Sequence, residues 1–195
     1  MRKSSLTAIL SAGLLLVGTA FISRAAYIPA KAALAQVLLR QAWARAQGGE
    51  GTVKPWAWAD IAPVAEIEIP RLNQHEIVLE GVSGQAMAFG PGHMPNTPSI
   101  GSRGTAIVAA HRDTQFRFLG KLVAGDRIET TDARGRHNVF RVTATSVVKA
   151  DASGIDPTEG GPSGARLALV TCYPFNGVFH SPWRYVVLAD REVGS

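Results

Sequence analysis

The first part of the chain carries a long uncharged, mainly apolar stretch preceded by basic residues. Leu6–Ile22 is a run of 17 residues without a charge, and Arg2 and Lys3 come before it. At 1.5 Å per residue, a helix of this length spans about 26 Å, close to the thickness of a bilayer core. The pattern predicts a membrane anchor over residues 6–23, with residues 1–5 as a cytoplasmic tail.

A cleaved signal peptide is the alternative to a retained anchor, because Gly18-Thr19-Ala20 has the small residues of a cleavage site. The next segment favours retention. Ala32–Ala46 is predicted to form an amphipathic helix at the membrane surface or against the domain, and its face is set by residues at helical spacing: Leu34, Val37, Leu38, Gln41 and Arg45. Pro29 before it and the glycines after it fit helix boundaries.

Residues 24–60 are therefore interpreted as a juxtamembrane helix followed by a linker. The linker contains Trp56 and Trp58, which point the same way in an extended segment. Two interpretations remain open for this pair. The tryptophans pack on the following domain, or they form an aromatic belt at the lipid headgroups.

From Val64 onward the apolar period changes from 3.6 to 2, which is typical of strands. Strands are predicted at residues 64–69, 75–80, 105–111, 126–131, 137–148, 166–172 and 183–190. Short strands separated by Gly, Pro, Asn and Asp indicate a mainly β domain, a barrel or a sandwich, over residues 61–195. A helical turn is expected at 114–122 and a Gly- and Pro-rich surface loop at 151–164.

Charge is distributed unevenly along the 195 residues. Residues 1–49 hold six Lys or Arg and no acid, whereas residues 50–195 hold 14 basic and 15 acidic side chains, so that the predicted domain has a net charge of −1. Basic residues around an apolar helix favour anionic lipid headgroups. A nearly neutral domain lacks the positive face that nucleic acid requires, so no nucleic-acid partner is expected.

Cys172 is the only cysteine and ends an apolar, strand-like run, Leu167–Cys172. A single cysteine in a chain that looks exported cannot form an internal disulfide, which makes it a candidate nucleophile. The alternative is a buried cysteine that acts as a small apolar side chain. A thiol nucleophile needs a base or a cation nearby to raise its thiolate fraction.

Two further residues end or enter apolar strand faces in the same manner. His111 ends the run Thr105–His111, and Arg184 shares a face with Val186 and Leu188 by period-2 counting. An imidazole can act as the base, and a guanidinium can hold a carbonyl oxygen that becomes an oxyanion. A structural histidine and an edge arginine that reaches solvent are the alternatives.

These segments together resemble the sortases, over roughly residues 60–190. Leu169–Cys172 matches the cysteine signature of that family, Ala110–Arg112 matches its histidine signature, and Arg184 falls in its arginine position, twelve residues past the cysteine. Gly90–His93 is similar to a segment that precedes the histidine strand. The tryptophan-containing linker and the preceding helix are similar to those of the sortases of Gram-negative proteobacteria.

The resemblance implies an eight-stranded sortase-type β-barrel and a membrane-anchored cysteine transpeptidase. Cys172 would attack the threonine carbonyl of an LPXTG-like sorting motif and form a thioester, which an amine resolves. His111 would protonate the leaving amine, and Arg184 would stabilise the oxyanion. His93, Thr171 and Tyr173 would bind the substrate. Beside the histidine, Arg112 and Asp113 are either supporting groups or, as we expect, a solvated pair.

The partner implied is an exported protein with a C-terminal sorting signal, in the Gram-negative group a single target with von Willebrand A-type and related domains. The enzyme would span the inner membrane once, with its catalytic domain in the periplasm. No cofactor is implied, and no metal site is expected, because the other histidines share no spacing with carboxylates: His75, His93, His137 and His180.

Three alternatives to this activity remain. A thiol peptidase would resolve the thioester with water, and a membrane-tethered β-barrel would bind a peptide without catalysis. An L,D-transpeptidase of the cell wall would carry Ser-His-Gly before the cysteine, whereas Leu169-Val170-Thr171 precedes Cys172 here.

Overall fold

The computed structural model describes residues 2–177 and 181–193, without the side chains of residues 2–10, 20, 22, 25, 26 and 28. Its first element is one helix, α1 (Arg2–Arg45), followed by a short π-helical turn at Ala46–Glu50. The helix passes through Pro29, so the predicted break between an anchor helix and a second helix is absent. Alanines surround the proline, and alanine has the highest helix propensity.

Among the described residues, no helix is both long enough and apolar enough to cross a membrane. The predicted anchor at 6–23 falls in part on side chains that lie outside this description.

A compact unit begins at Leu38 and extends to the end of the chain. Within it, the last turns of α1 bury Leu39, Ala42 and Trp43. The face that packs on the domain is therefore not the predicted one, because Gln41 and Arg45 of the predicted face are exposed within this unit. The face that packs is formed by Leu39, Ala42 and Trp43, which also follow the i, i+3, i+4 spacing of a helix. The sequence alone offers two such faces, and contact with the domain decides which one is buried.

These buried helix residues extend the core of the unit outward in two clusters. Leu39 packs with residues of the linker and of the barrel wall, among them Ile61 and Leu79. Trp43 packs with Val53, and its indole N–H donates to the Glu66 carboxylate at 3.4 Å. The end of α1 is thus part of the folded unit.

The two linker tryptophans have different environments, so neither prediction holds for both. Trp56 is partly buried, and its ring meets that of Phe89 edge to face at 5.4 Å. Trp58 is 81% exposed.

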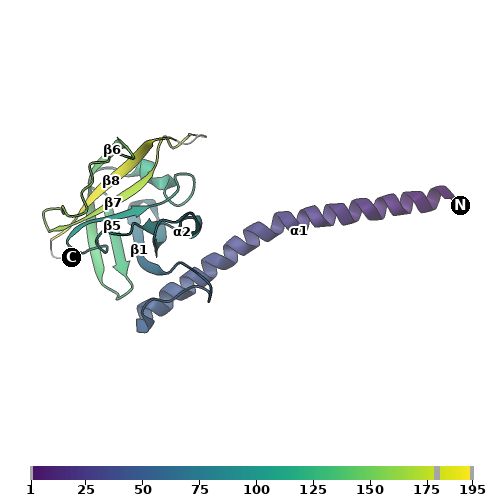
Figure 1. The fold of residues 1–195 in the computed structure, drawn as a ribbon, viewed down its shortest axis with the longest axis horizontal. Helices are drawn as coiled ribbons and strands as arrows, with labels where there is room; N and C mark the ends of the chain where they lie inside the picture. Colours follow the sequence, from purple (N-terminus) through teal and green to yellow (C-terminus); the bar gives the residue numbers. More distant parts are fainter. Residues whose placement is uncertain (1, 178–180, 194–195) are drawn as a thin grey trace. The chain divides into compact units, whose positions relative to one another are not determined.

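Eight strands close into a barrel in the order β1-β2-β3-β4-β7-β8-β6-β5, which confirms the predicted eight-stranded β-barrel (Figure 1). Two neighbouring pairs are parallel, β2 with β3 and β4 with β7, and the other pairs are antiparallel. The strands span β1 (Pro63–Ile69), β2 (Gln74–Glu80), β3 (Gly92–His93), β4 (Gly104–Ala109), β5 (Arg127–Asp132), β6 (His137–Lys149), β7 (Ala165–Cys172) and β8 (Trp183–Arg191).

All the strands predicted from period-2 patterns are present, within a few residues at their ends. The sequence did not predict β3, which has only two residues, or α2 (Gly84–Phe89), whose first turn is capped by Ser83. The turn expected at 114–122 is a 3₁₀ helix at Arg117–Lys121. A two-residue strand has no periodicity to detect, because β3 is defined by pairing with distant residues.

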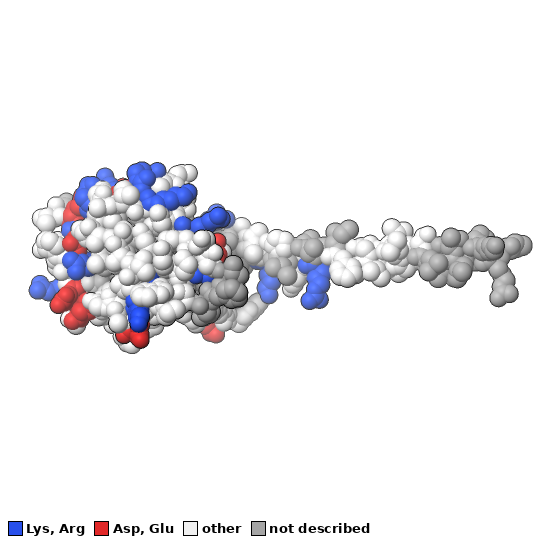
Figure 2. Space-filling view, turned by 90° about the horizontal axis from the view of Figure 1, so that it is seen from above, with Lys and Arg blue, Asp and Glu red and all other residues white. Residues whose placement is uncertain are grey.

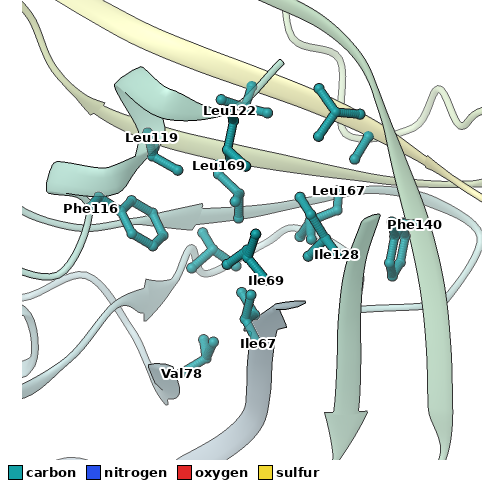
Figure 3. Close-up of a cluster of buried hydrophobic side chains, with 14 of the residues drawn as sticks. Ile67, Ile69, Val78, Phe116, Leu119, Leu122, Ile128, Phe140, Leu167 and Leu169 are labelled. Carbon is teal, nitrogen blue, oxygen red and sulfur yellow. The ribbon is translucent and has the colours of Figure 1, made fainter. Parts of the chain in front are cut away.

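The barrel is filled by aliphatic and aromatic side chains that alternate along the strands (Figure 3). Ile67 and Ile69 of β1, Leu167 and Leu169 of β7 and Phe140 of β6 are fully buried there. Each alternates with residues that point out of the barrel. Because of this alternation, every second side chain of β4, β7 and β8 points out of the barrel. The candidate site lies on that outer face.

On the face that Figure 2 shows, acidic and basic side chains lie next to one another along the margin of the barrel, and the centre carries few charges. That face therefore has no continuous basic surface of the kind that phosphate backbones require.

Candidate active site at the ends of β4 and β7

Cys172 is the last residue of β7 and points away from the barrel interior. Leu167, Leu169 and Thr171 are buried, and strand alternation places Cys172 on the opposite face, with Val170. The thiol is half-buried and unbonded to another cysteine. A rigid strand therefore presents it at its end.

His111 follows the end of β4, which runs parallel to β7 with Ala109 opposite Val170. The pairing continues beyond the strand: the Ala110 N–H donates to the Val170 carbonyl at 3.2 Å, and the Thr171 hydroxyl donates to the Ala110 carbonyl at 2.7 Å. One residue further, this register brings His111 level with Cys172 on the neighbouring strand, and neighbouring strands lie about 4.8 Å apart. His111 itself is exposed.

Arg184 stands opposite Cys172 on the other side of β7, because β8 pairs antiparallel with β7 and the two residues are partners in the register. Its Nη1 donates to the carbonyls of Ser181 and Trp183 at 2.8 and 2.9 Å. No carboxylate of the described residues pairs with it. Backbone carbonyls thus hold one end of the guanidinium, and its remaining N–H groups can donate to a ligand.

The three sequence-predicted residues therefore meet at one edge of three adjacent strands, on the outer face of the barrel. In chemical terms, a thiol can act as a nucleophile, an imidazole can carry a proton, and a guanidinium can donate hydrogen bonds to an oxyanion. Among the described residues, no group of His, Cys, Asp or Glu is arranged to hold a metal ion. His180 lies outside the described residues.

The outer face continues from this row toward the loop between β6 and β7. Val186 and Leu188 share the face of Arg184 and line a small cavity of about 80 Å³ beneath that loop. Thr105 of β4 anchors the loop, because its N–H donates to the Pro157 carbonyl at 2.9 Å and its hydroxyl donates to the Glu159 carbonyl at 2.5 Å. The loop predicted at 151–164 thus lies along the face that leads to Cys172.

The other predicted substrate-binding residues are engaged within the fold. Thr171 is 2% exposed and donates to Ala110. The Tyr173 ring stacks on Tyr185 with centroids 6.2 Å apart. His93 is buried, with its Nε2 at 2.9 Å from the Pro98 carbonyl, and it lines a separate cavity of about 570 Å³ whose lining contains none of the three aligned residues.

Arg112 lies 3.6 Å from the Asp113 carboxylate, as the predicted pair requires. The prediction that the pair is solvated is wrong for Arg112, which is only 8% exposed. Its Nη2 donates to the Gly177 carbonyl in the connection between β7 and β8. No periodic pattern identifies such a residue, because its partner comes from a loop 65 residues further along the chain.

Comparison with known proteins places this geometry in a family. Residues 67–192 match the Sortase domain. The chain is 30% identical over 125 residues to sortase D of Bacillus subtilis (strain 168), covering 64% of this chain and 62% of that protein's length.

Solved structures agree with the fold. Sortase E from Streptomyces avermitilis has 31% identity and a TM-score of 0.56, over 67% of this chain and 88% of that chain. Sortase A from Corynebacterium diphtheriae has a TM-score of 0.60 at 20% identity, over 86% of each chain. None of these three relatives is a sortase of the Gram-negative group. The barrel, the matching domain and the signature segments together show that this chain belongs to the sortase family of cysteine transpeptidases.

Proposed function

We propose that the protein cleaves an LPXTG-like sorting motif and transfers the acyl part to an amine. The observation that carries this proposal is the row formed by His111, Cys172 and Arg184 across β4, β7 and β8. A barrel that only binds peptides would have no need of a thiol aligned with both groups.

In the first step, the thiolate of Cys172 attacks the carbonyl carbon of the motif's threonine. The carbonyl oxygen takes up the negative charge, and the free N–H groups of Arg184 stabilise it. The C–N bond then breaks, and His111 gives a proton to the leaving amine. A thioester on Cys172 and a released peptide are the products.

In the second step, an amine attacks the thioester carbon. His111 takes a proton from the incoming amine, the C–S bond breaks, and a new amide forms.

Mass spectrometry of the purified full-length chain incubated with a library of LPXTG-like peptides tests the proposal. We expect an acyl adduct on Cys172 and none with Cys172→Ala. His111→Ala and Arg184→Ala should each lower the cleavage rate by about 10². The matched control is Arg134→Ala, since Arg134 is an exposed arginine in the turn between β5 and β6. This variant should cleave normally. An adduct on another residue, or cleavage that survives methanethiosulfonate labelling of Cys172, contradicts it.

Membrane attachment through residues 6–23 is part of the proposal. It is supported by the 17 uncharged residues that follow Arg2 and Lys3. With this orientation the barrel would face the periplasm of a Gram-negative cell, and an exported protein with a C-terminal sorting signal would be its partner. Carbonate extraction of cell membranes tests the attachment, since a chain that washes into the supernatant has no spanning segment.

The Gram-negative assignment is supported by the tryptophan-containing linker and the helix before it. Its test is a periplasmic reporter that carries the candidate partner's C-terminal signal. We expect cleavage of the reporter by the wild type and none by Cys172→Ala, and a reporter left intact by the wild type would contradict the assignment.

A further inference from the structure

Arg112 is a buried arginine between two exposed neighbours. The side chains of His111 and Asp113 face solvent, whereas Arg112 is 8% exposed. Burial of a guanidinium is costly unless its N–H groups are bound. The position of this side chain is therefore fixed by what accepts its hydrogen bonds.

One acceptor lies in the connection that follows Cys172. Arg112 Nη2 donates to the carbonyl of Gly177, and Nε lies 3.6 Å from the Asp113 carboxylate, which is 70% exposed. A hydrogen bond from a charged donor is stronger than one between neutral groups. The residue after the histidine is thus bound to the loop that begins at the cysteine.

Gly177 is fitted to this contact. A Cβ at position 177 would lie 2.9 Å from Arg112 Nη1 and 3.1 Å from the Pro174 carbonyl oxygen. The Gly177 N–H also donates to that carbonyl at 3.0 Å, which closes a turn over residues 174–177. The backbone angle does not require glycine here, so the close approach is the constraint: a side chain at position 177 would displace the end of the Arg112 guanidinium.

Two hydrogen bonds therefore flank the segment that holds the histidine and the cysteine. Thr171 binds the Ala110 carbonyl just before the pair, and Arg112 binds Gly177 just after it. The β4 ladder ends at Ala109, and the segment after it is held by the Arg112 bond to Gly177 together with the bond from the Phe116 N–H to the His111 carbonyl at 3.0 Å.

We propose that Arg112 is a positioning residue that holds the His111 imidazole within reach of the Cys172 thiol by fastening the segment after β4 to the connection after β7. This inference rests on the proposed function, in which the two groups act together. A small displacement of reacting groups costs about 10² in rate. Loss of this tie therefore affects the chemical step more than peptide binding.

The rate of disulfide formation between positions 111 and 172 measures how closely these two residues are held, without any catalysis. In the full-length His111→Cys chain, the introduced thiol and Cys172 are on adjacent strand ends, where the Cα separation suits a disulfide. Oxidised glutathione should close this disulfide readily. Adding Arg112→Ala should slow its formation by about tenfold or more, and adding the exposed control Arg117→Ala should not change it.

Peptide cleavage is the second readout, with position 111 left as histidine. We expect Arg112→Ala to lower kcat by about 10 to 10² with KM within about twofold, because the substitution shifts the reacting groups and leaves the remaining surface of the barrel unchanged. Gly177→Ala should also lower kcat, because it changes the residue whose carbonyl accepts the hydrogen bond from Arg112. Arg112→Lys, which keeps the charge but not the planar fork, should recover part of the loss.

The outcomes separate this inference from the proposed function. If His111→Cys forms no disulfide with Cys172 in the otherwise native chain, the two residues are not adjacent and the proposed function fails together with this inference. If the disulfide forms at the same rate with and without Arg112, and kcat is unchanged, only the positioning role is refuted. Should Arg112→Ala fail to fold, Arg112→Lys and Gly177→Ala give the same comparison.

Discussion

Glu76 is a carboxylate placed on the inner side of the barrel wall. On β2 it is the cross-strand partner of Ile67, a fully buried core residue, and directly paired residues share a face. Burial raises the pKa of Glu76 from 4.5 to about 7. No hydrogen bond or ion pair to this carboxyl occurs within the described residues. We therefore expect Glu76→Gln to stabilise the protein at neutral and alkaline pH.

The sign and size of the change in unfolding free energy follow from the linkage between proton binding and folding. The folded protein holds this proton more tightly than the unfolded chain, so the contribution of Glu76 to stability falls as the pH rises from about 4.5 to about 7 and is level above that. At 1.36 kcal/mol per pH unit, the full effect is about 3.4 kcal/mol. Because the side chain is only half-buried and water screens part of the charge, we expect about 1–2 kcal/mol.

Urea unfolding of the full-length wild type and Glu76→Gln at about pH 4.5 and about pH 8 measures this. The gain from the substitution should be near zero at the lower pH and reach its full size at the higher one. Glu80→Gln is the control on the same strand, since the Glu80 side chain is 59% exposed. A gain that is equal at both pH values, or equal to that of the control, would refute the reasoning.

Three other substitutions test the contacts that shape the site and the unit. Thr171→Val should cost about 1–3 kcal/mol in urea unfolding, because the buried Ala110 carbonyl loses its donor, and Thr171→Ser should restore most of it. Trp43→Ala should cost about 3–5 kcal/mol by the same assay, and a value near zero would mean that the end of α1 is not part of the folded unit. Gly92→Ala should lower the thermal midpoint sharply, because its Cβ would lie 2.1 Å from the Gly81 carbonyl oxygen; an unchanged midpoint would contradict the close packing of β3.

Much of the fold was readable from local patterns. Alternation of apolar residues located β1, β2 and β4–β8, because burial on one face of a strand acts on every second residue. The three residues of the candidate site were found in the same way, as chemically unusual residues at the ends of apolar strands. Local patterns failed for the end of the helix, where Gln41 of the predicted face is exposed and Leu39, which is outside that face, is buried.

By itself, the sequence determined which residues form strands and which side chains carry chemistry, since both depend on neighbours along the chain. Tertiary structure alone decided that β4 lies parallel beside β7 and that His111 is level with Cys172. It also decided that Arg112 is buried against Gly177 and not solvated. Such pairings join residues more than 60 positions apart, and their register is set by closing the whole barrel around one core, which no local periodicity encodes.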